Sequence, residues 1–167
     1  MEYPQVNSFS TFLELFQNLE LPLPIRPDSY KESPNNHTEI PIELAQKYLL
    51  TEEDEEVDEY TEIMPFGKIT HFRAFNCLIY FRGDLNGYKY ILLTLDQEGN
   101  KIDRLQVAGT HYTANDLSNS VGLIEPDGTV VVQLGISSVG GHIMLHFDTG
   151  IKIKYQILED GQIDVEL

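Results

Sequence analysis

The sequence predicts an α+β fold, in which two N-terminal helices precede an antiparallel β meander of about eight or nine strands. Apolar residues recur at helical spacing within residues 1–60, whereas short runs rich in branched and aromatic residues fill residues 63–167. Glycines beside Asp or Asn separate these runs, as hairpin turns require. The length of 167 residues is typical of one domain, so we expect a single domain over 1–167 whose sheet is curved or forms a partly closed barrel.

The first predicted helix spans residues 10–19, with Ser8 or Ser10 as its N-cap. The next segment, LPLPIRP, contains three prolines, which remove backbone donors and favour an extended path. The apolar face of the helix consists of Phe9, Phe12, Leu13, Phe16 and Leu19.

The second predicted helix spans residues 41–50, because Pro41 suits a first helical position. Its shared apolar side consists of Ile42, Ala45, Tyr48 and Leu49. The stretch TEEDEEVDEYTE at 51–62 follows, with eight carboxylates and no Lys or Arg. Because negative charges oppose the dipole at a helix C-terminus, we expect the helix to end near Thr51 and the acidic stretch to be a solvated loop.

The predicted strands follow this acidic linker. Three turns, around Gly99, Gly128 and Gly161, share an acid and a glycine between strands at intervals of 29 and 33 residues. Such spacing fits an internal repeat or part of a propeller, but we favour a plain meander. The strand candidates are IMPFGKITHF, FNCLIYFR, YKYILLTL, KIDRLQVA, SVGLIE, TVVVQLGI, HIMLHFD, IKIKYQIL and QIDVEL.

Alternation along the strands assigns their faces. In IKIKYQIL the odd-numbered residues from Ile151 to Ile157 are apolar and alternate with Lys and Gln, which predicts a half-buried strand. YKYILLTL is apolar on both faces and is therefore predicted to be central. Its second layer is expected to come from Phe12, Phe16 and Leu19.

The charge excludes some classes of partner. Eleven Lys and Arg against 27 Asp and Glu give a formal net charge of −16, which disfavours nucleic acid and anionic membranes and favours a basic protein partner. No run approaches 18 apolar residues and no signal peptide is evident, so we expect a cytoplasmic protein unless an export signal was removed. Cys77, within FNCLIYF, is interpreted as a small buried hydrophobe.

Catalytic and metal motifs are weak. His142, His146 and Asp148 share one side of a predicted strand, and His111 or His71 is a candidate third nitrogen for Zn²⁺. However, strand residues four apart lie about 13 Å from each other, which is too far for one metal without a bulge. The sequence contains neither a G-x-S-x-G nucleophile elbow nor a phosphate-binding G-x-x-x-x-G-K-[ST] loop. We therefore predict no catalytic residue, metal or cofactor.

The acidic stretch itself has two interpretations. One is a solvated connector that keeps the protein soluble. The other is a recognition surface, in which Val57 and Tyr60 place an apolar and an aromatic group within a negative field that attracts a cationic partner. The predicted partner-binding residues are Glu52, Glu53, Asp54, Glu55, Glu56, Val57, Asp58, Glu59 and Tyr60.

The phrases FLELFQNLELPLPI at 12–25, MPFGKI at 64–69 and ILLTLDQEGNKIDRL at 91–105 resemble a group of uncharacterised bacterial proteins of similar length. In its layout and acidity the chain resembles the immunity proteins encoded beside bacterial toxins. This resemblance implies a non-enzymatic protein-binding module that neutralises a basic toxin by occluding its active site. The alternatives are a metal-dependent hydrolase using His142, His146 and Asp148, and a structural or ligand-binding β domain of an exported protein.

Overall fold

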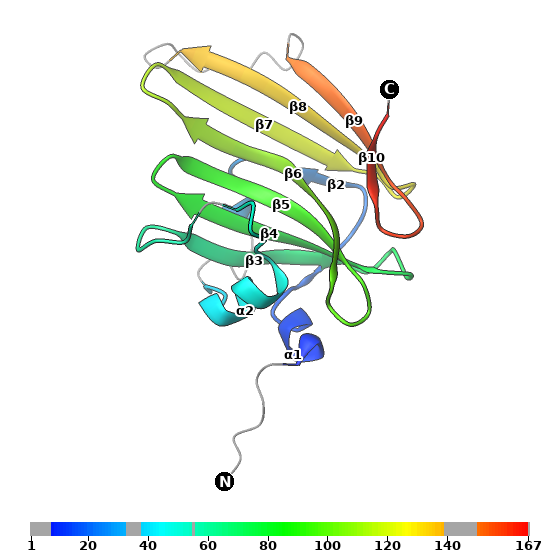
Figure 1. Cartoon of the computed structure of the whole chain (residues 1–167). Coiled ribbons are helices and arrows are strands. Elements are labelled where there is room, and N and C mark those ends of the chain that lie inside the picture. The colour runs from blue at the N-terminus through cyan, green and yellow to red at the C-terminus, as the bar shows by residue number, and fades with distance from the viewer. Residues whose placement is uncertain (1–7, 33–37, 55, 139–149, 167) are drawn as a thin grey trace.

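The computed structural model describes residues 8–32, 38–54, 56–138 and 150–166, with the backbone alone at 136–138. Its main feature is one ten-stranded sheet in which the strands from β3 to β10 follow one another in chain order (Figure 1). The strands of this meander are β3 (Glu62–Ile69), β4 (Asn76–Asp84), β5 (Gly87–Leu95), β6 (Lys101–Tyr112), β7 (Asp116–Ile124), β8 (Thr129–Ser138), β9 (Ile151–Ile157) and β10 (Ile163–Val165).

The predicted antiparallel meander is confirmed, but the strand count is not. Two further strands, β1 (Asn18–Leu19) and β2 (Leu23–Ile25), come from the N-terminal part, where no strand was predicted. β1 pairs with β3 in parallel, so the sheet is mixed. In the described residues the strand order runs from β1 at one edge to β10 at the other, so the sheet is open rather than closed.

The sheet splits between β6 and β7. These two strands pair only between Gly109–Tyr112 and Leu117–Ser120, and β2 pairs with the other end of β7. The C-terminal hairpin returns toward β6, where the Ile163 N–H donates to Asp103 Oδ2 at 2.9 Å. The two parts of the sheet thereby enclose an inner core, which includes Phe66, Ile79, Leu92, Val107, Ile124, Val130 and Ile157.

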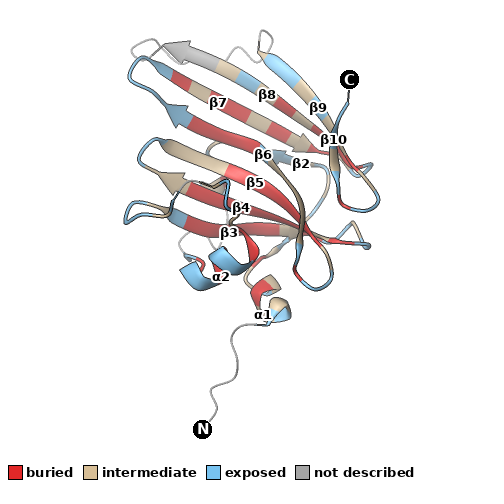
Figure 2. Ribbon diagram, viewed as in Figure 1, coloured by how far each residue is buried: buried red, intermediate tan, exposed pale blue. Residues whose placement is uncertain are grey.

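The opposite face of β3, β4 and β5 is covered by α1 (Phe9–Leu13) and α2 (Ile42–Tyr48). This outer core includes Phe12, Phe16, Leu44, Tyr48, Leu78, Tyr80, Ile91 and Leu93. Figure 2 shows β4 and β5 as the strands most continuously buried. The prediction of a central, doubly covered β5 is therefore confirmed.

The predicted extent of the first helix is wrong. α1 ends at Leu13, and the following turns close with bonds from Leu15 N–H to Phe12 O and from Phe16 N–H to Leu13 O. The chain then joins the edge of β3, where the Lys68 N–H donates to Gln17 O at 2.7 Å. Phe12 and Phe16 provide the second layer as predicted, whereas Leu19 packs against the inner core.

The second helix is shorter than predicted, and one residue of its apolar face differs. α2 ends at Tyr48, with Leu49 as its C-cap. Ala45, Tyr48 and Leu49 are buried as expected, but Ile42 is 38% exposed and Leu44 is buried instead. The buried stripe therefore begins at Leu44, the third helical residue.

Three hairpins share one turn geometry. In the turns of Gly99, Gly128 and Gly161 the glycine φ lies between 87° and 91°, where side chains are strained. Each glycine N–H donates to the carbonyl three residues earlier. The recurring acid-glycine pattern therefore marks hairpins of a meander.

The predictions for Cys77 and for the half-buried strand β9 are largely confirmed. Cys77 is 1% exposed, and burial raises the pKa of its thiol to about 12, so it behaves as a buried hydrophobe. β9 is half-buried as predicted from Ile153 onward, since Ile153 and Tyr155 are partly buried and Ile157 is 5% exposed, whereas Ile151 at its start is 66% exposed. The described helices are all too short to cross a membrane.

Candidate functional site

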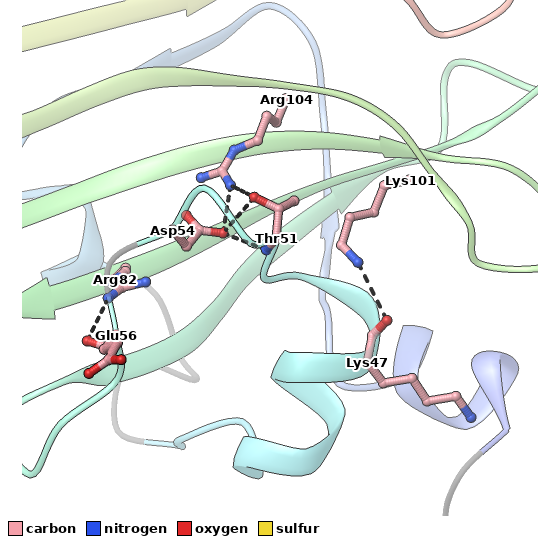
Figure 3. A network of polar contacts seen from close by, with 7 residues as sticks. All are labelled: Lys47, Thr51, Asp54, Glu56, Arg82, Lys101 and Arg104. Carbon is pink, nitrogen blue, oxygen red and sulfur yellow. Dashed lines mark hydrogen bonds and ion pairs between the residues drawn. The ribbon is translucent and has the colours of Figure 1, made fainter.

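The acidic segment, defined as residues 51–62, runs from the end of α2 to the start of β3, and its described residues form neither helix nor strand before Glu62. It lies against the outer side of the sheet, where Arg82 of β4 and Arg104 of β6 point toward it (Figure 3). The predicted loop is confirmed. However, the segment is attached to the sheet rather than fully solvated.

Asp54 is the residue through which the segment is held. Its side chain is 5% exposed, and its Oδ2 accepts hydrogen bonds from the backbone N–H of Thr51 at 2.7 Å and from Arg104 Nη1 at 2.6 Å. Arg104 Nη1 also donates to the Thr51 hydroxyl at 3.2 Å. The ion pair therefore joins β6 to the residues that follow α2.

The pKa of Asp54 reflects this environment. Burial alone would raise the pKa of the carboxyl, but the hydrogen bond from Arg104 and those from Thr51 outweigh burial and hold the pKa below its ordinary value of 3.8. The same carboxylate raises the pKa of Arg104. Both groups are therefore charged at neutral pH.

Two further cations contact the backbone near this pair. Arg82 is 2% exposed, and its Nη2 donates to the carbonyl oxygen of Glu56 at 3.4 Å. Lys101 Nζ donates to the carbonyl oxygen of Lys47 in α2 at 3.5 Å. The acidic segment and α2 are thus held on the sheet by basic side chains from β4 and β6.

The role of these basic residues was not predicted from the sequence. Arg82 follows Leu78 and Tyr80 at strand spacing, so alternation places a charged group on a buried face. A buried charge requires a partner, and this was the available signal. Nothing in the local pattern indicated that Arg104 would meet Asp54, which lies 50 residues earlier in the chain.

The attached segment forms one wall of a groove, hereafter the acidic groove, of about 470 Å³ beside the end of α2. The groove contains the carboxylates of Glu52, Asp54 and Glu56 next to the apolar side chains of Leu50 and Val57. Glu52 and Glu56 are exposed, whereas Leu50 and Val57 are half-buried. The groove therefore combines negative charge with apolar walls.

Three large apolar side chains are exposed near the same end of the sheet. Tyr60 is 53% exposed, Leu85 is 72% exposed and Tyr112 is 50% exposed. Glu62 of β3 pairs with Gly83 of β4, and the Tyr112 N–H donates to Asn86 O at 2.7 Å. The strand ends that carry these three residues are therefore neighbours. Tyr60, Leu85 and Tyr112 are hereafter the apolar row.

The predicted partner-binding residues differ in how far they are exposed to solvent. Glu52, Glu53, Glu56, Asp58, Glu59 and Tyr60 are exposed. Asp54 is instead a buried anchor, Val57 packs against the outer core, and Glu55 lies outside the described residues. Asp58 also shapes the loop, since its Oδ1 accepts from the Tyr60 N–H at 2.9 Å.

The metal hypothesis falls largely outside the described residues. His142, His146 and Asp148 lie in 139–149, which the structure does not describe. His111 lies at the end of β6 beside Gly87, and His71 follows β3 at the other end of the strands. In the described residues no three His, Cys, Asp or Glu side chains are grouped to hold a metal ion.

Comparisons with protein-family models, with curated proteins and with solved structures gave no match for this chain.

Proposed function

We propose that this protein is a non-enzymatic binding protein that presents its acidic segment to a basic protein partner. The observation that supports this function most directly is the acidic groove, in which three carboxylates lie beside two apolar side chains. Because Asp54 is bound to Arg104, the start of the segment is fixed to β6 before any partner arrives. Such preorganisation reduces the conformational entropy lost on binding.

The composition of the groove specifies the side chain that it accepts. Lys and Arg bury an aliphatic stem along apolar surface while the charged end stays near polar groups. Leu50 and Val57 suit the stem, and Glu52 and Glu56 suit the charged end. We therefore expect one Arg or Lys of the partner to enter the groove.

The apolar row extends this surface. Tyr is enriched among interface residues with large binding contributions, and Tyr60 and Tyr112 are both half exposed. Asp58 and Glu59 precede Tyr60 directly and are exposed, which gives the row an acidic border. This arrangement of apolar centre and charged rim is common in protein interfaces.

The sequence resemblance to immunity proteins suggests a specific partner class. We propose that the partner is a bacterial toxin with a basic active-site cleft and that binding occludes this cleft. A net charge of −16 would speed the encounter with such a partner, since complementary potentials raise association rates.

The test is binding to the protein encoded by the adjacent gene, measured by surface plasmon resonance. The groove variant is Glu52→Gln with Glu56→Gln, which leaves the Asp54 anchor intact. We expect its affinity to fall at least about tenfold, because the two charges both steer the partner during association and slow its dissociation through direct contacts.

The matched control is Glu159→Gln with Asp164→Asn, which removes the same charge from exposed positions at the C-terminal hairpin. We expect this control to bind nearly as well as the native protein. The proposal is overturned if no complex forms, or if both double variants weaken binding equally.

A further inference from the structure

We infer that a second site, distinct from the acidic groove, binds a free amino acid with an aromatic side chain. The site is a groove of about 570 Å³, hereafter the aromatic groove, where the inner core reaches one end of the sheet. It is framed by residues 71–75 before β4, by the β7–β8 turn and by the β9–β10 turn, which lie at the same end of the sheet (Figure 1). Among the described residues, the two grooves share no lining residue.

One wall of the aromatic groove is made of stacked rings. Phe75 directly precedes β4 and is 4% exposed, and Phe72 stacks on it with ring centroids 5.4 Å apart and planes inclined by 17°. Phe72 is half-buried, so part of its ring remains accessible. His71 packs nearly perpendicular to Phe72, with ring centroids 5.4 Å apart. Because aromatic rings associate in such stacked and edge-to-face arrangements, this wall favours a ligand that carries a ring.

The three framing connections are joined to one another. A β-carbon at Gly161 would lie 3.1 Å from Phe75 Cγ, so the β9–β10 turn packs directly on this ring. Gln156 Nε2 donates to the carbonyl oxygen of Asp127 at 2.8 Å, which joins β9 to the β7–β8 turn. A frame that is already held together reduces the conformational entropy lost on binding.

Arg73 provides the one Lys or Arg side chain of the described lining. Basic side chains are scarce in this chain, with 11 Lys and Arg in 167 residues. Arg73 is exposed, and it takes part in no ion pair among the residues that the structure describes. Its planar guanidinium can hold a carboxylate through two parallel N–H···O bonds. Arg73 therefore suits the carboxylate of an amino acid.

Asp127 and Glu159 provide the opposite charge from the two turns. Asp127 Oδ1 accepts from the Thr129 N–H at 2.9 Å, and this bond lowers the pKa of the carboxyl below its ordinary value of 3.8. Glu159 takes part in no ion pair within the described part of the chain. Carboxylates accept hydrogen bonds from an ammonium group. A zwitterion therefore satisfies both signs of charge, whereas a simple anion or cation satisfies one.

The size of the aromatic groove fits a small molecule. Small-molecule sites occupy about 300 to 1,000 Å³, and Pro126 and Ile157 add apolar surface beside the rings. An aromatic amino acid has about twelve non-hydrogen atoms, for which a dissociation constant of about 1 mM is expected. Exposed ion pairs contribute little on their own, so ring contacts supply most of the affinity and the charges supply selectivity.

The experiment is an NMR titration of the isolated ¹⁵N-labelled protein with L-phenylalanine. We expect saturable shifts at the amides of Phe72, Arg73, Asp127 and Leu158. Glycine, which lacks the ring, should produce no saturable shift. N-acetyl-L-phenylalanine lacks the ammonium charge and L-phenylalaninamide lacks the carboxylate, so each should bind about two- to fivefold more weakly than phenylalanine. A capped probe that binds as tightly as phenylalanine would overturn the assignment to a free amino acid.

Arg73→Gln tests the carboxylate contact. We expect it to weaken phenylalanine about two- to fivefold and to leave phenylalaninamide unchanged, because the amide offers Arg73 no carboxylate. Phe72→Leu keeps apolar bulk against the inner core but removes the ring, so it should weaken all three phenyl probes about threefold or more. Lys152→Gln, at an exposed position of β9 outside the groove, should change none of them.

Two results contradict the inference. One is the absence of saturation with phenylalanine, and the other is an equal loss of phenylalanine and phenylalaninamide binding in Arg73→Gln. Since no protein partner is present in these titrations, their result is independent of the proposed function.

Discussion

Asp54 illustrates how one residue of a highly charged stretch can differ from its neighbours. It lies among seven other carboxylates in the sequence, yet its side chain is buried against Arg104. Removing one member of a partly buried, hydrogen-bonded pair leaves the other without compensation. The stability of the acidic segment should therefore depend on this carboxylate far more than on those around it.

Asp54→Asn should lower the free energy of unfolding by about 1 to 3 kcal/mol at pH 7. Because the folded-state pKa is lowered, the carboxylate stabilises the fold above the unfolded value near 3.8, and this contribution is lost as pH falls through the folded value. Urea unfolding should thus show native protein and variant converging below about pH 4. Glu53→Gln, at an exposed neighbour, should change stability little at either pH.

Two buried tyrosines allow a second comparison. Tyr80 is 0% exposed, and its hydroxyl has no hydrogen-bond partner in the described residues. Tyr90, also 0% exposed, donates to Pro27 O at 3.0 Å and accepts from the Tyr30 N–H at 2.7 Å. Burial raises the pKa of both tyrosines, so both hydroxyls remain protonated at neutral pH.

Tyr80→Phe should be neutral or stabilising, because it removes an unpaired buried polar group. Tyr90→Phe should destabilise by about 1 to 3 kcal/mol, because the Pro27 carbonyl and the Tyr30 N–H lose their partner. Thermal and urea unfolding of the two variants measure the difference. A greater loss for Tyr80→Phe than for Tyr90→Phe would contradict this account.

At the level of elements, the helices depend on the sheet for their stability. α1 has five residues and α2 has seven, and isolated helices below about 12 residues are marginal in water. What keeps α1 in place is burial of its aromatic side chains. Phe12 stacks on Tyr48 of α2 with ring centroids 4.7 Å apart, so the two helices stabilise each other over the sheet.

Phe12→Ala should therefore destabilise the protein by about 3 to 5 kcal/mol, the usual cost of removing a fully buried Phe. Hydrogen exchange should show α1 losing protection first, while the central strands β4 and β5 remain protected. Phe9→Ala serves as the comparison, because Phe9 is only half-buried and should cost less. Equal losses for both would indicate that the outer core does not hold α1.

On the scale of the whole molecule, charge is the dominant property. A net charge of −16 makes the folded state repel itself, and salt screens this repulsion over about 10 Å at 0.1 M. The acidic groove adds a local concentration of that charge beside the end of α2. Salt should therefore affect folding and partner binding in opposite directions.

Raising sodium chloride from 10 to 300 mM should increase the free energy of unfolding, because compact negative charge is screened. The same change should reduce the association rate with the adjacent-gene protein, because steering is screened as well. Urea unfolding and surface plasmon resonance over one salt series check both. An association rate that does not change with salt would contradict the electrostatic part of the proposal.

Local patterns in the sequence determined the strands from β3 to β10, most turns and the doubly buried β5. Alternation and positive-φ glycines depend on neighbouring residues, so they are readable without knowledge of the fold. The early end of α1 was not readable in this way, since the edge of β3 offers Gln17 a backbone hydrogen bond that a continued helix could not provide. β2 likewise depends on a free edge of β7, created where β6 departs.

The acidic stretch and the net charge were evident from the sequence by itself, because composition needs no coordinates. Only the tertiary structure decided which carboxylate became an anchor and which formed a groove, since Asp54 and Arg104 lie 50 residues apart in the chain. The position of Arg82 on β4 directly across from Lys89 on β5 likewise follows from strand register. The net charge follows from the composition alone, whereas the distances between the charged groups are set by the fold.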